Sequence, residues 1–139
     1  MRRLADKNMF QDTEKTVFIT GFSPDLRIHV EKTASLKGYR PVALKLEDAE
    51  EQIQSVPDLR MLIKISKGSE IPFIRKITTR YPELSLAVCI DYQDRESIHS
   101  LIHSRAIPVF FVPIRDLELS QTLKTMEQLR ERSYSRSLI

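Results

Sequence analysis

The feature that most constrains this 139-residue chain is a series of four short apolar runs separated by polar segments of similar length. Each run is nearly continuous rather than alternating, which is typical of strands buried on both faces by helices in a parallel sheet. A weaker fifth run, 41–46, begins with Pro41, a residue that suits the start of a strand or the edge of a sheet. The four strong runs are residues 17–20, 61–65, 84–90 and 107–112.

The segments between the runs carry helix signals. The first opens at Ser23-Pro24, an N-cap followed by proline at the first helical position, and closes at Gly38. The second, 47–56, is acidic at its start, as the helix dipole favours, and stops before Pro57. Apolar residues at helical spacing predict three more helices: Ile71, Ile74 and Ile77; Ile98, Leu101 and Ile102, capped by Asp94; and Leu119, Leu123 and Met126, with fraying over residues 133–137.

Strands and helices therefore alternate through the chain, joined by connections of a few residues. This order predicts an α/β fold, a flavodoxin-like doubly wound (βα)5 with a five-stranded parallel sheet in the strand order 2-1-3-4-5. The length suits one domain with one hydrophobic core. We expect an N-terminal extension over residues 1–15, the domain over 16–132, and a C-terminal tail or the start of a linker over 133–139.

Composition narrows the class of protein. Cys89, the one cysteine, lies inside an apolar run and is interpreted as a buried small hydrophobe. The net charge is +3 and the pI about 9.1, but acidic residues are interleaved with basic ones, unlike the basic face of a nucleic-acid binder. The first 15 residues lack the apolar core of a signal peptide, and no run approaches the ~20 apolar residues of a membrane span. We expect a cytoplasmic location.

Four short sequence segments, in the right order for this topology, resemble those of one family. They are 37–42 (KGYRPV), 57–63 (PDLRMLI), 80–84 (RYPEL) and 111–114 (FVPI). Together they resemble receiver domains of two-component response regulators, CheY-like proteins, over residues 16–130. In that family two acidic residues after the first strand hold a divalent metal and an aspartate ending the third strand accepts a phosphoryl group. A hydroxyl residue and a lysine then bind the phosphoryl oxygens, because transfer builds negative charge on them.

The resemblance implies that this chemistry is lost here. The acidic pair is replaced by Gly21 and Phe22, and the acceptor position falls on Ile63 or Lys64. An aromatic residue that reports phosphorylation in the family is replaced by Val109. The resemblance thus implies a pseudo-receiver, an atypical response regulator that is not an enzyme and needs no metal or cofactor. The hydroxyl position falls on Ile90, and the lysine-proline step on Val112 and Pro113.

The resemblance also implies that the protein signals by binding another protein, such as an ATPase, a kinase or a transcription regulator, or a second copy of itself. Receiver domains commonly use the face formed by the fourth helix, fifth strand and fifth helix. No membrane association and no direct nucleic-acid contact are expected. On helical geometry the outward residues of that face are Arg95, His99, His103, Gln121, Thr125 and Gln128.

Several residues permit a second interpretation. Lys64 either replaces the positive charge of the metal or snorkels at a strand end. Asp91 and Asp94 are either a relocated acidic pair or helix caps. His99 and His103 have a spacing that can chelate zinc, although no third ligand is evident, and the turn at Gly68 lacks the full glycine-rich phosphate motif.

Two other functions stay open. The chain is also consistent with the N-terminal regulatory domain of a DNA-binding transcription regulator, with residues 130–139 starting a linker. A small-molecule sensor would instead use a pocket at the carboxyl ends of the strands, the usual ligand position in such sheets.

Overall fold

The computed structural model describes residues 15–56, 58–66, 70–96 and 107–138, and there the five predicted strands form one parallel sheet. The strand order is β2-β1-β3-β4-β5, so the predicted fold class and topology are confirmed. Thr20 pairs with Ile63 and Asp91 pairs with Val112, which brings the carboxyl ends of these strands to one edge. The strands are β1 (Thr16–Thr20), β2 (Arg40–Ala43), β3 (Arg60–Ile65), β4 (Ser85–Asp91) and β5 (Val109–Val112).

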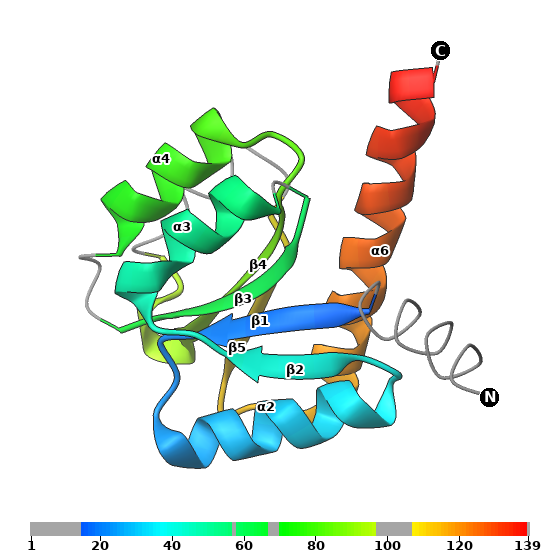
Figure 1. Ribbon diagram of the computed structural model, residues 1–139. Helices are drawn as coiled ribbons and strands as arrows, with labels where there is room; N and C mark the ends of the chain where they lie inside the picture. Colours follow the sequence, from blue (N-terminus) through cyan, green and yellow to red (C-terminus); the bar gives the residue numbers. More distant parts are fainter. Residues whose placement is uncertain (1–14, 57, 67–69, 97–106, 139) are drawn as a thin grey trace, which may run out of the picture.

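Helices cover both faces of the sheet, giving the three layers visible in Figure 1. One face carries α3 (Leu46–Ser55) and α4 (Ile71–Arg80), and the other carries α2 (Pro24–Leu36) and α6 (Asp116–Leu138). A short 3-10 helix, η1 (Tyr92–Asp94), follows β4. The fourth predicted helix, around Ile98, Leu101 and Ile102, lies outside the described residues.

Local signals in the sequence explain where the first helix and strand begin and end. The Ser23 hydroxyl accepts a hydrogen bond from the Leu26 amide at 3.4 Å, and Pro24 opens α2, so the predicted N-cap is confirmed. Gly38 follows the helix with φ of +92°, a conformation that favours glycine. Pro41 lies in the edge strand β2, where its missing amide hydrogen is tolerated.

Two boundaries differ most from the prediction. The second strand ends at Ala43 rather than at residue 46, because Leu46 begins α3 and the acidic Glu47 and Asp48 lie in its first turn. The last helix does not fray at residue 133 but continues to Leu138 (Figure 1). No glycine or proline follows Pro113, so the sequence contains no residue that would stop the helix.

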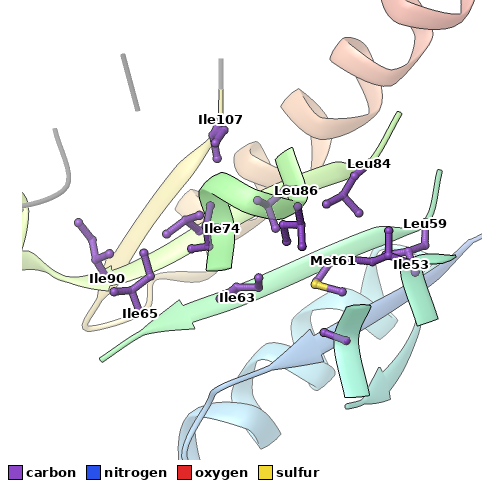
Figure 2. Packing of buried hydrophobic residues seen from close by; sticks show 13 residues of the cluster. Ile53, Leu59, Met61, Ile63, Ile65, Ile74, Leu84, Leu86, Ile90 and Ile107 are labelled. Atoms are coloured by element: carbon purple, nitrogen blue, oxygen red, sulfur yellow. The ribbon is translucent and has the colours of Figure 1, made fainter. Parts of the chain in front are cut away.

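Two apolar clusters fill the layers between sheet and helices. The first lies under α3 and α4 and takes side chains from β3 and β4, as Figure 2 shows. The second lies under α2 and α6 and includes Cys89, which is fully buried as predicted. Because successive residues of a strand point to opposite faces, Met61, Ile63 and Ile65 of β3 join the first cluster and Leu62 joins the second, and all six residues of the strand are buried.

Candidate functional site

The candidate site is the edge of the sheet where β1, β3, β4 and β5 end. Gly21 follows β1 with φ of +85°, and a Cβ atom built there would lie 2.7 Å from the backbone oxygen of Lys64. The chains after β1 and along β3 therefore approach too closely for any side chain at residue 21. The next residue, Phe22, stacks on Phe110 of β5 with ring centroids 6.4 Å apart. Of the two residues predicted to replace the acidic pair, Gly21 is thus a close backbone contact, and Phe22 is a half-buried aromatic that packs against the cluster under α2 and α6.

Ile63 and Ile90, predicted to stand at the acceptor and hydroxyl positions, belong to the apolar cluster under α3 and α4. Their exposed fractions are 0% and 1%. Figure 2 shows both among Ile65, Ile74 and other aliphatic side chains of that layer. A carboxylate at either position would be desolvated without a counter-charge, which costs several kcal/mol in order of magnitude.

Lys64 is the buried cation of the site. Its side chain is 6% exposed, and its ammonium donates a hydrogen bond to the Ile65 carbonyl at 3.0 Å. The same ammonium lies 3.6 Å from a carboxylate oxygen of Asp91, the last residue of β4. The interpretation of Lys64 as a side chain snorkelling to water is wrong, because its charge is neutralised inside the fold. Asp91 ends β4 and stands at the N-cap position of η1, but its side chain makes no capping hydrogen bond and pairs with Lys64 instead.

Cys89 lies beside this pair, since it is the register partner of Lys64 across β3 and β4. Burial raises the pKa of its thiol to about 12, against an opposing effect of the Lys64 ammonium. The thiol is therefore protonated at neutral pH, and a nucleophilic role has no support.

β5 carries the remaining predicted site residues. Val112 ends the strand half-buried against the cluster under α2 and α6, and Pro113, joined to it by a cis peptide bond, is exposed. Val109, at the predicted position of the switching aromatic, is half-buried against the other cluster. The neighbouring Phe111 packs edge-on against Tyr92 with centroids 5.4 Å apart.

Thr20, the last residue of β1, was not predicted to belong to the site. Its side chain is 1% exposed, and its hydroxyl has no hydrogen-bond partner among the described residues. A threonine ending an apolar run looks like an ordinary strand residue. Only the surrounding structure distinguishes a satisfied hydroxyl from an unsatisfied one.

The predicted partner face is described in part. Gln121, Thr125 and Gln128 are exposed on α6, while Leu119, Leu123 and Met126 are buried beneath them, as predicted. Arg95 is exposed and stacks over the Tyr92 ring with its guanidinium carbon 4.2 Å from the centroid. His99 and His103 lie outside the described residues, as does Gly68.

A second polar cluster, which the sequence did not predict, lies at the opposite end of the sheet. Arg60 of β3 is 8% exposed and donates to both carboxylate oxygens of Glu127 on α6, at 2.5 and 3.2 Å. The Tyr39 hydroxyl donates to the same carboxylate at 2.8 Å. Burial would raise the pKa of Glu127, but the hydrogen bonds from Arg60 and Tyr39 outweigh it and lower that pKa. These hydrogen bonds connect α6 to β3 of the sheet.

No group of three or more His, Cys, Asp or Glu side chains arranged to hold a metal ion occurs within the described ranges. None of the helices described is both long enough and apolar enough to cross a membrane.

Solved structures with the same arrangement of strands and helices include response regulators. One from Thermotoga maritima matches with a TM-score of 0.65 at 19% identity, over 80% of this chain and 95% of that chain. The fold is that of a response regulator receiver domain. A CheY-like protein, tadZ, from Pseudomonas aeruginosa shares this receiver fold with a TM-score of 0.64 at 14% identity, over 81% of this chain and 98% of that one.

NtrX from Brucella abortus, in a structure with ADP, has a TM-score of 0.67 at 19% identity. That match covers 87% of this chain but 29% of NtrX, so the receiver fold found here spans less than a third of that protein. No protein-family model matches the sequence, and no curated protein matches it. At these identities the likeness establishes the receiver fold.

Proposed function

We propose that this protein is a receiver-like signalling module that acts without phosphoryl transfer, by binding another protein. The observation that carries the proposal is the apolar burial of Ile63 and Ile90 beside a lysine, Lys64, that already has its own counter-ion in Asp91. Phosphoryl transfer needs carboxylates to hold a metal and a free cation to stabilise the transferred group. Neither is available from these side chains.

The backbone at Gly21 supports the same proposal. Its positive φ and its close approach to the Lys64 oxygen leave no room for an acidic side chain at that position. At this position the backbone packing, and not only the side chain present, excludes an acidic residue.

A receiver fold without this chemistry retains its surfaces. We propose that the working surface is the predicted partner face, here represented by Arg95, Gln121, Thr125 and Gln128, which are all exposed. The partner is another signalling protein, or a second copy of this chain.

The first experiment is incubation with acetyl phosphate and Mg²⁺, followed by intact-mass measurement. We expect no addition of a phosphoryl group. Stoichiometric, hydroxylamine-labile incorporation would refute the proposal.

The surface is tested by sedimentation and by binding to candidate partner proteins. We expect Arg95→Glu and Gln121→Arg to abolish association while folding stays intact, because exposed substitutions usually change stability by no more than about 0.5 kcal/mol. Arg27→Glu, at a half-buried position on α2 beside Glu31, tests the opposite side of the molecule. If Arg27→Glu alone abolished association, the working surface would be the α2 side.

A second candidate is the N-terminal regulatory domain of a longer transcription regulator. It is favoured by the match to NtrX, in which the similar part is 29% of that chain. Determining the gene sequence beyond the codon for Ile139 separates the two candidates.

A further inference from the structure

The segment that leaves β4 is held by contacts from three sides. From the interior, the Lys64 ammonium lies 3.6 Å from the carboxylate of Asp91. From the side, the Phe111 ring packs edge-on against the Tyr92 ring at 5.4 Å. From the surface, Arg95 stacks on Tyr92 and donates a side-chain hydrogen bond to the Tyr92 carbonyl at 2.9 Å. The Arg95 amide donates to the same carbonyl at 3.2 Å.

The charges around this segment come from two further elements. Lys64 comes from β3, and Glu118 from α6 accepts a hydrogen bond from the Phe111 amide of β5 at 3.4 Å. The ion pair of Lys64 and Asp91 joins β3 to the end of β4, and the hydrogen bond of Glu118 joins α6 to β5.

We infer that the Lys64–Asp91 ion pair is a permanent internal lock that holds residues 91–95 in one conformation and so keeps Tyr92 and Arg95 in place on the protein surface. A buried ammonium that loses its counter-charge is strongly disfavoured, so Asp91 has little freedom to leave. Tyr92 is 54% exposed, and its exposed ring with a stacked arginine is the composition found at the centres of protein interfaces. A surface held in this way is preformed and needs no modification to appear.

The role of the lock in presenting a partner surface rests on the proposed function, but the lock itself is a property of the chain. Its test is hydrogen exchange measured by mass spectrometry on peptides that cover residues 91–95. We expect Lys64→Met to speed exchange there at least tenfold. The matched control is Lys76→Met, because the Lys76 ammonium lies 2.9 Å from the Glu50 carboxylate on the other face of the sheet. The control should leave exchange in residues 91–95 unchanged.

Two variants at positions more exposed than Lys64 keep the test valid if Lys64→Met fails to fold. Asp91→Asn removes the carboxylate charge and Arg95→Ala removes the outer stack, and each should speed exchange in residues 91–95 at least threefold. Unchanged exchange in Asp91→Asn and Arg95→Ala, or in a folded Lys64→Met, overturns the lock. Incorporation of phosphate by the unmodified protein would refute the proposed function and leave the lock standing. Unchanged exchange in the variants, together with no phosphate incorporation, would overturn the lock and leave the proposed function standing.

Discussion

Replacing Gly21 by alanine measures how firmly the end of β1 is fixed against β3. At φ of +85° an L-residue costs roughly 1–2 kcal/mol, and forcing an atom into a packed interior adds about 1–3 kcal/mol. The added Cβ would lie 2.7 Å from the Lys64 backbone oxygen, and backbone cannot swing aside as a side chain can. Gly21→Ala should therefore lower the free energy of unfolding by about 2–5 kcal/mol, a large part of the roughly 5–15 kcal/mol of a typical domain.

Gly38→Ala is the matched control, because Gly38 has φ of +92° but a Cβ there meets nothing within 4 Å. The unfolded-state gain from replacing glycine, about 0.4–1 kcal/mol, is the same in both variants. Urea unfolding followed by circular dichroism should place Gly38→Ala within about 1–2 kcal/mol of the parent protein, with Gly21→Ala clearly lower. Equal midpoints for the two variants would refute the steric argument and reopen residue 21 to an acidic side chain.

Two other predictions concern buried titratable groups. Cys89 should react with a thiol reagent such as Ellman's reagent only as fast as the protein unfolds, since burial holds its pKa at about 12; rapid labelling of the folded protein contradicts this. The pKa of Glu127 is lowered in the folded state, so its contribution to stability is present above its unfolded pKa and is lost as the pH falls through the folded value. Glu127→Gln should flatten the fall in urea midpoint between about pH 5 and pH 2 relative to the parent, and an unchanged slope would show that Glu127 is not involved.

The fold could be predicted because its signals are local and repeated. Four continuous apolar runs, the Ser23-Pro24 cap and the glycine at residue 38 each specify one boundary, and the short connections leave few topologies. The C-terminal end of α6 was predicted wrongly, because serine and arginine are weak signals for ending a helix in the absence of glycine or proline.

The polar contacts could not be predicted, because they join residues far apart in the chain. Arg60 lies beside the apolar run 61–65 and Lys64 lies inside it. Such positions indicate buried charges but do not indicate which residues pair with them. The partners, Glu127 and Asp91, are 67 and 27 positions away along the chain and become neighbours only through the sheet and α6. The sequence therefore predicted which carboxylates are missing from the site and left open which charges remain.

The lock also separates stability from conformational specificity. A buried ion pair is weak evidence for stability, because desolvation offsets much of its attraction, and replacing both partners by apolar groups is often neutral or stabilising by about 1–4 kcal/mol. We therefore expect Lys64→Met/Asp91→Leu to unfold at the same urea concentration as the parent or at a higher one, while exchange in residues 91–95 becomes faster. Asp91→Leu alone should lose stability, since it leaves the Lys64 ammonium, 6% exposed, without its carboxylate. If the double variant unfolded at a lower urea concentration and also exchanged faster in residues 91–95, the ion pair would be a stabilising contact of the core. An unchanged urea midpoint with faster exchange in residues 91–95 shows that the role of the ion pair is to fix one conformation of the surface.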